Sequence, residues 1–150
     1  MGSASRGSLG DAGSGSPRVI AADTSVLVRY LVGTPVAQAR QAAKLIDDDD
    51  LEIGISPVTL AECAHVLRTQ YEVPARDVID CLIDLVQREN IRMLGVSTDL
   101  VVQHLVLARS IPGRPIPDAL IVAAAVAGGA ESLATFDRDR RRYGIPIRQP

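Results

Sequence analysis

The sequence predicts an α/β protein organised around a central, mainly parallel sheet. Short apolar runs alternate along the chain with longer segments that have helical periodicity. The first run, RVIAA at 18–22, is almost continuously apolar, as expected for a strand that is covered on both faces. Alternating strands and helices favour a parallel sheet between two helical layers. We therefore expect a three-layer α/β/α domain with four or five strands.

The first half of the chain predicts two strands and four helices. Pro35 falls in the first turn of one helix, and Ser56-Pro57 provides an N-cap and an N1 proline for another. The expected strands are 18–22 and 51–55, and the expected helices are 24–32, 35–46, 57 to about 70, and 74–88.

The second half continues the same alternation. IRML at 91–94 is a strand candidate, and Ser97 caps a helix over 98–110. Three prolines and a glycine make 111–117 a loop. An alanine-rich helix over 118–127 then ends at Gly128-Gly129. The last predicted strands are 132–136 and a short fifth near 145–147.

The composition indicates one domain with an aliphatic core. The chain has 150 residues, of which 47% are hydrophobic, with one Phe, three Tyr and no Trp. With sixteen basic and eighteen acidic residues the net charge is close to zero, so it neither indicates nor excludes a nucleic-acid partner. The two cysteines form no CxxC pair, which argues against a disulfide framework or a structural zinc site.

The ends of the chain and its apolar runs predict where the domain lies. Residues 1–17 are rich in Gly and Ser and have no apolar core of a signal sequence, so we expect a flexible leader followed by one domain over 18–150. No apolar stretch reaches the roughly 20 residues of a membrane helix. The expectation is a cytoplasmic protein with no membrane association.

Four carboxylates fall where a parallel sheet places its sites. Asp23 follows the first predicted strand, and Asp137 follows the fourth. Asp118 lies in the first turn of a helix, and Glu62 lies in the second turn of the helix after the second strand. Because α/β sheets bind ligands beyond the carboxyl ends of their strands, these residues are candidates for one site.

Each carboxylate also has an ordinary structural role open to it. Asp23 could cap a helix, Asp118 could favour a helix dipole, Asp137 could begin a turn, and Glu62 could be an exposed helical residue. If the four instead converge, their mutual repulsion calls for a cation. Ligation by oxygen alone favours Mg²⁺ or Mn²⁺ over zinc, and such ions promote phosphodiester hydrolysis by activating water.

Three stretches carry a resemblance to a known family. VIAADTSVLVRYL at 19–31 has an opening strand followed by Asp, Thr and Ser, and ISPVTLAECAHVLRTQYEV at 55–73 has a Ser-x-x-Thr-x-x-Glu helix. IPDALIVAAAVAGGAESLATFDRD at 116–139 has a helix-starting Asp and ends in Thr-Phe-Asp-x-Asp. In order and spacing these stretches resemble PIN-domain ribonucleases, and specifically the VapC toxins of prokaryotic VapBC toxin–antitoxin pairs.

The resemblance assigns roles to individual residues. It implies an acidic, metal-binding and catalytic set, which comprises Asp23, Glu62, Asp118 and Asp137. It places Ser25 and Thr135 at supporting polar positions and Asp139 at a further acidic position that varies in the family. It thus implies a Mg²⁺ (or Mn²⁺) cofactor and hydrolysis by a metal-activated water.

The resemblance also implies partners. These are a structured RNA substrate such as tRNA or rRNA, a cognate VapB-like antitoxin whose C-terminal segment obstructs the acidic site, and a second copy in a homodimer. Helices over 24–46 and 57–71 are candidates for the protein contacts. Few aromatic residues are available to stack on bases. Phosphates could be held by the arginines after Asp137, which are Arg138, Arg140, Arg141 and Arg142, or these could form a solvated charged terminus.

Two other functions stay open at this stage. One is a catalytically silent PIN-like binding module that acts in a protein complex. The other is an α/β phosphatase with an Asp after its first strand, which needs a second Asp two residues later and a downstream Lys. Position 25 is Ser and the one lysine is Lys44, so the phosphatase is poorly supported. The run at 47–50, DDDD, points its side chains in different directions and predicts a solvated helix end.

Overall fold

The computed structural model describes residues 18–113, 115–137 and 144–150. Within them the chain alternates between short strands and helices, as the sequence predicts. The elements are β1 (Val19–Ala21), α2 (Thr24–Val32), α3 (Val36–Ile46), β2 (Glu52–Ile55), α4 (Pro57–Thr69), α5 (Ala75–Val86), β3 (Ile91–Met93), α6 (Thr98–Ser110), α7 (Ile116–Ala127), β4 (Leu133–Ala134) and β5 (Ile147–Arg148).

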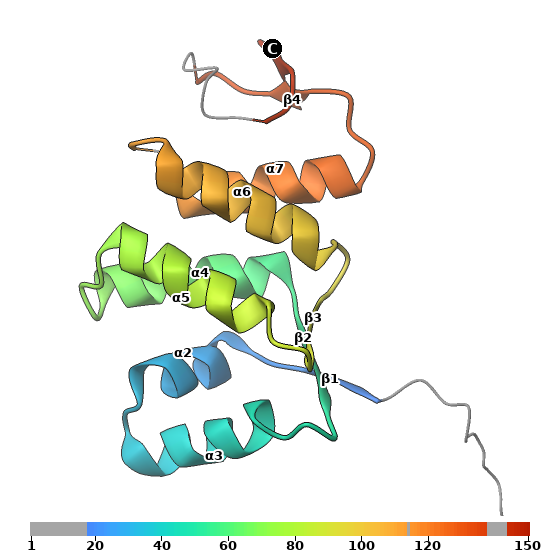
Figure 1. Ribbon diagram of the computed structural model, residues 1–150. Coiled ribbons are helices and arrows are strands. Elements are labelled where there is room, and N and C mark those ends of the chain that lie inside the picture. The colour runs from blue at the N-terminus through green and yellow to red at the C-terminus, as the bar shows by residue number, and fades with distance from the viewer. Residues whose placement is uncertain (1–17, 114, 138–143) are drawn as a thin grey trace, which may run out of the picture.

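The main sheet is parallel, with the strand order β1-β2-β3 (Figure 1). Central β2 is its most buried strand, and the side chains of Ile53 and Ile55 are fully excluded from solvent. Because the strands are parallel, their carboxyl ends share one edge of the sheet. Asp23 and Ser56 follow two neighbouring strands at that edge. The α/β class with parallel strands is confirmed.

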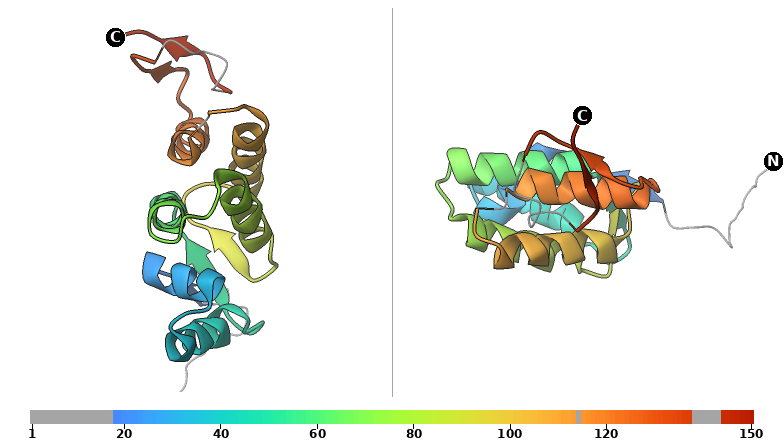
Figure 2. Two further views of the ribbon diagram at one scale, coloured as in Figure 1. Left: turned by 90° about the vertical axis from the view of Figure 1, so that its left-hand side faces the viewer. Right: turned by 90° about the horizontal axis from the view of Figure 1, so that it is seen from above.

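The two short C-terminal strands form a sheet of their own. The amide of Leu133 donates to the carbonyl of Pro146 at 2.8 Å, and β4 pairs only with β5 among the described residues. Figures 1 and 2 show this pair beyond α6 and α7, away from the three-stranded sheet. The prediction of one central sheet with four or five strands is therefore wrong in its strand count. A two-residue strand has little sequence signal to specify its partner.

The first strand lies at an edge of the main sheet. The side chains of Val19 and Ile20 are each 38% exposed, although the apolar run predicts a strand that is buried on both faces. Strand side chains point to the two faces of the sheet, and among the described residues β1 packs substantially against β2 alone, so helices cover its faces little.

The helices lie in three successive pairs, α2 with α3, α4 with α5, and α6 with α7 (Figure 1). Neighbouring pairs pack through α2 against α4, α4 against α7, and α5 against α6. The buried aliphatic core runs through these pairs and onto β2 and β3. No helix in the described part of the chain is both long enough and apolar enough to cross a membrane.

Helix ends follow the predicted capping residues closely. The Ser56 hydroxyl accepts a hydrogen bond from the Thr59 amide at 3.1 Å, and the Ser97 hydroxyl accepts one from the Leu100 amide at 3.2 Å. Each bond satisfies a helix N–H that has no partner within the helix. Helix α7 begins at Ile116, two residues earlier than predicted, because a proline in the first turn costs no helical hydrogen bond.

A polar network ties three helices together next to the acidic run. The Tyr30 hydroxyl donates to Asp47 Oδ1 at 2.8 Å, and Arg88 Nη2 donates to the same oxygen at 2.7 Å. Arg88 Nη1 also donates to the Tyr30 hydroxyl at 3.1 Å. Burial is the main cause of the raised pKa of Tyr30, and the Asp47 carboxylate adds to it. The first residue of DDDD thus lies at the predicted helix end, but it is held by Arg88 and Tyr30 and is not simply solvated.

Candidate functional site

Asp23 lies at the turn from β1 into α2. The amide of Ala22 still donates to the carbonyl of Gly54 at 2.9 Å, so the sheet positions the backbone up to the residue before Asp23. Asp23 is the N-cap of α2, and its Oδ1 accepts from the Thr24 amide at 2.8 Å. The structural role that the sequence leaves open is therefore present. A carboxylate has further lone pairs, so capping does not consume its capacity as a ligand.

Glu62 is joined to this turn by Thr24. The Thr24 hydroxyl donates to Glu62 Oε1 at 2.8 Å, across 38 residues of sequence. Helices α2 and α4 pack against each other, and this bond fixes the glutamate of α4 beside the first turn of α2. Asp23 and Glu62 thus lie on either side of one threonine. Sequence reasoning did not single out Thr24, although its position directly after Asp23 is a signal that could have found it.

Asp118 lies in the first turn of α7, where the helix dipole favours a negative charge. It is partly buried, and α7 packs against α4, the helix that carries Glu62. The neighbouring Ile116 and Pro117 line a small pocket together with Ala64, His65, Arg68 and Thr69 of α4. Asp118 is therefore placed beside the C-terminal half of α4.

Asp137 lies three residues after β4, the first strand of the separate two-stranded sheet. Its amide donates to the Thr135 hydroxyl at 3.0 Å, and the amide of Thr135 donates to the carbonyl of Arg148 at 3.0 Å. Thr135 thus ties the backbone of Asp137 to β5. Asp23 follows a strand of the three-stranded sheet, whereas Asp137 follows a strand that belongs to the other sheet.

The four carboxylates are not gathered into one cluster. Among the described residues, no group of three or more His, Cys, Asp or Glu side chains is arranged to hold a metal ion. What the structure brings together is the pair Asp23 and Glu62, bridged by Thr24. Both are exposed, so solvent and a phosphate group have access to them.

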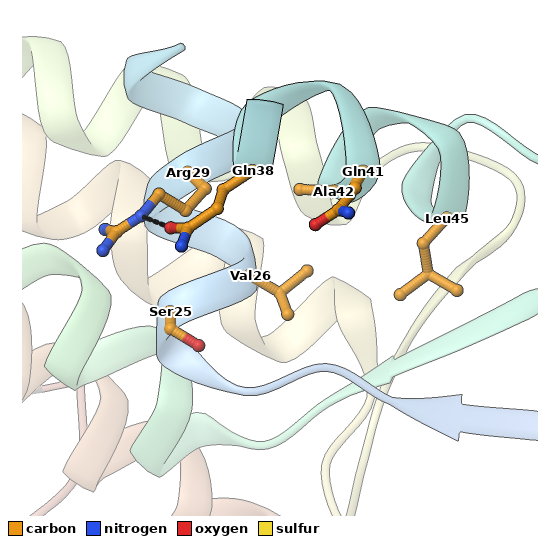
Figure 3. A pocket seen from close by; sticks show the side chains of 7 residues that line it. All are labelled: Ser25, Val26, Arg29, Gln38, Gln41, Ala42 and Leu45. Atoms are coloured by element: carbon orange, nitrogen blue, oxygen red, sulfur yellow. Dashed lines mark hydrogen bonds between the residues drawn. The ribbon is translucent and has the colours of Figure 1, made fainter. Parts of the chain in front are cut away.

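Ser25 lines a pocket of about 450 Å³ between α2 and α3 (Figure 3). Arg29 Nε donates to Gln38 Oε1 at 2.7 Å across this pocket. Val26 and Leu45 add apolar surface to the same lining. Ser25 is two residues from Asp23 in the sequence, but Asp23 and Glu62 are not among the residues that line the pocket.

The remaining predicted site residues follow Asp137 in the sequence. Arg138, Asp139, Arg140, Arg141 and Arg142 lie outside the described residues. Their predicted roles in RNA binding and acidic support remain predictions.

The chain is similar to known proteins in its sequence profile and in its structure. A profile of the PIN domain family matches residues 20–146, and the chain belongs to this family. Among solved structures, it is similar to a chain in the crystal structure of VapBC2 from Rickettsia felis. That complex is bound to a DNA fragment from its own promoter. That likeness has 17% sequence identity and a TM-score of 0.37, and covers 88% of this chain and 98% of that one. No curated protein matches the chain.

Proposed function

We propose that the protein is a VapC-type toxin, a Mg²⁺- or Mn²⁺-dependent endoribonuclease that cleaves structured RNA such as tRNA or rRNA. The observation that carries this proposal is the PIN domain match over residues 20–146, since PIN domains are typically nucleases that use divalent metal ions. The Asp23–Thr24–Glu62 arrangement supports it, because two acidic residues of the resemblance meet in the fold.

The donor set fits a hard divalent ion. Asp23 and Glu62 offer carboxylate oxygens, with no nitrogen or sulfur donor among the residues of the pair. Mg²⁺ keeps several water ligands and is commonly held by one or two carboxylates together with substrate phosphates. A bound ion of this kind neutralises phosphate charge and activates water for attack.

Individual residues of the chain have distinct proposed roles in binding the metal ion. Asp23 and Glu62 would hold the ion, and the hydrogen bond from the Thr24 hydroxyl would orient the Glu62 carboxylate through Oε1. Asp118 and Asp137 are proposed ligands from the resemblance. Asp118 lies on α7, which packs against the helix that carries Glu62, whereas Asp137 follows β4 of the separate sheet.

The decisive experiment is cleavage of a total tRNA and rRNA pool by the purified chain, in Mg²⁺ or EDTA, with matched variants. Asp23→Asn retains a good capping side chain but loses the charge. Glu62→Gln retains an acceptor for Thr24. We expect discrete Mg²⁺-dependent products from the wild type and none from either variant.

The matched control is Asp99→Asn, which removes an exposed carboxylate from the first turn of α6. It should cleave like the wild type. If the wild type leaves RNA intact in every metal condition, the nuclease proposal fails. The absence of a three-carboxylate group among the described residues would then favour the alternative, a catalytically silent binding module.

A VapB-like antitoxin and a second copy of the chain are the proposed protein partners. The pocket between α2 and α3 is a suitable place for an antitoxin segment, because Ser25 at its rim is two residues from Asp23. An antitoxin bound there should stop cleavage. Gln41→Arg places a bulky charged group in the pocket lining and should weaken antitoxin binding. This variant should therefore cleave RNA even when the antitoxin is added. Light scattering of the purified chain would report the homodimer.

A further inference from the structure

We propose that the phosphodiester backbone of the RNA binds in a pocket lined by Arg68, Arg76 and Arg109. The inference rests on the proposed function and extends it to a substrate-binding surface. The pocket has a volume of about 330 Å³ and lies where the end of α4, the start of α5 and the end of α6 meet. The apolar floor includes Ile79 and Pro115. This arginine pocket brings together three positive charges that come from three different helices.

Two of these arginines form no direct ion pair among the described residues, although the charge of Arg76 contributes to the lowered pKa of Asp80. Arg68 and Arg76 are exposed, and neither takes part in an ion pair within the described residues. The chain as a whole has a formal net charge of −2, so a basic pocket is not simply the consequence of a basic protein. Clustered positive charge that is left open to solvent is the electrostatic footprint of a polyanion site.

Arg109 keeps hydrogen-bonding capacity despite its ion pair. Its Nε donates to Asp80 Oδ1 at 2.6 Å, and its Nη2 donates to Asp80 Oδ2 at 3.2 Å. A guanidinium has five N–H donors, so this fork leaves three for another anion. Asp80 and nearby Asp77 lower the local positive potential, but the charged side chains that line the pocket are all arginines.

Arg76 shares the first turn of α5 with Asp77, and the helix dipole favours the carboxylate rather than the guanidinium. Pro74, the N-cap residue, provides no side-chain hydrogen bond to the first N–H groups of this helix. A phosphate at this end of α5 would satisfy those donors and neutralise Arg76 together.

The arginine pocket extends toward a proposed ligand of the metal. Arg68 also lines a neighbouring pocket of about 240 Å³, together with His65, Ile116 and Pro117. Asp118 is the next residue of the chain. An RNA strand held at Arg76 and Arg68 would therefore run along α4 toward the acidic residues.

The test is binding of a fluorescent bulk tRNA pool, measured across a series of salt concentrations in EDTA, to the full chain and to Arg68→Gln/Arg76→Gln. We expect roughly tenfold weaker binding and a salt dependence (log K against log salt) shallower by about 1 to 2. The matched control is Arg40→Gln, which removes an exposed arginine on α3 away from the arginine pocket. It should bind like the wild type. Thermal unfolding checks the fold, and we expect Arg76→Gln alone to be no less stable than the wild type.

The outcomes separate this inference from the proposed function. If the wild type cleaves RNA but the double variant binds with the affinity and salt dependence of Arg40→Gln, the inference is overturned and the nuclease stands. If the double variant loses binding while no protein cleaves RNA, the arginine pocket stands and the nuclease fails. If the wild type binds no RNA at low salt, both are overturned.

Discussion

At the scale of single residues, Asp23 combines a structural contact with a proposed chemical one. It caps α2 through the Thr24 amide, and its carboxylate is a proposed metal ligand. Asp23→Ala should lower the free energy of unfolding by about 1 kcal/mol, whereas Asp23→Asn should nearly preserve it, because asparagine caps well and alanine does not. Both variants should lose cleavage. Urea unfolding beside the RNA assay measures the two effects separately.

A different result would reassign the residue. If Asp23→Asn cleaves RNA as well as the wild type, then Asp23 is only a cap. Equal stability of the Ala and Asn variants would instead mean that the 2.8 Å bond to Thr24 contributes little to the fold.

The two cysteines differ in how deeply they are buried. Burial raises the pKa of the Cys63 thiol to about 12, with a smaller contribution from Cys81. The pKa of Cys81 is also raised, by burial and then by nearby Asp84 and Asp77, but this thiol is only partly buried. Since the thiolate is the nucleophile, Cys63 should resist iodoacetamide at pH 8 in the folded protein while Cys81 reacts slowly.

Mass spectrometry of alkylated peptides measures both rates. In urea the two cysteines should react equally fast, because unfolding removes the desolvation of Cys63. Rapid labelling of Cys63 in the folded protein would contradict its burial.

At the scale of elements, local sequence signals predict the helices well. Helices 24–32 and 98–110 match α2 and α6 to the residue, since Asp23 and Ser97 mark where they begin. Capping is a local interaction and is therefore visible in the sequence. The strands are found near the predicted places but are shorter or shifted: the prediction at 132–136 becomes Leu133–Ala134, and the one at 145–147 becomes Ile147–Arg148.

The absence of a side chain at Gly54 in β2 leaves room for the side chain of Leu94, the residue after β3. A Cβ added to Gly54 would lie 2.8 Å from Leu94 Cδ2 and 3.0 Å from Leu94 Cγ. Gly54→Ala should therefore destabilise the protein by about 1–3 kcal/mol through overpacking. Leu94→Ala makes room, so the double variant should be more stable than the sum of the single effects indicates. Additive effects in urea unfolding would show that Leu94 does not limit this position.

The Asp80–Arg109 pair links α5 to α6 and predicts a pH dependence. Its hydrogen bonds and charge lower the pKa of Asp80 below the ordinary value of about 3.9. A lowered pKa in the folded state stabilises the protein above the ordinary pKa, and the effect is lost as the pH falls through the folded value. The stability difference between the wild type and Asp80→Asn should thus shrink below about pH 4. The pair is exposed, so added salt should reduce the difference too.

At the scale of the whole molecule, the sequence predicts the site only in part. The resemblance nominates Asp23, Glu62, Asp118 and Asp137 together, and the fold joins the first two through Thr24. The arginine pocket was not predicted, because Arg68, Arg76 and Arg109 come from three helices whose ends meet only in the folded chain. Contacts between distant segments depend on packing, which periodicity does not specify.

The division into two sheets predicts uneven stability across the molecule. Strand β2 lies between two partners and is buried, whereas β4 and β5 are two residues each and pair only with one another among the described residues. An isolated pair of strands is marginally stable, so the amides of Leu133 and Thr135 should exchange with deuterium long before those of Ile53 and Ile55. Residue-resolved hydrogen exchange measures this difference. If Leu133 and Thr135 were as protected as Ile53, β4 would have to belong to a larger sheet. The side of β1 not paired with β2 is where it would fit, and Asp137 would then follow a strand beside β1, the strand that precedes Asp23.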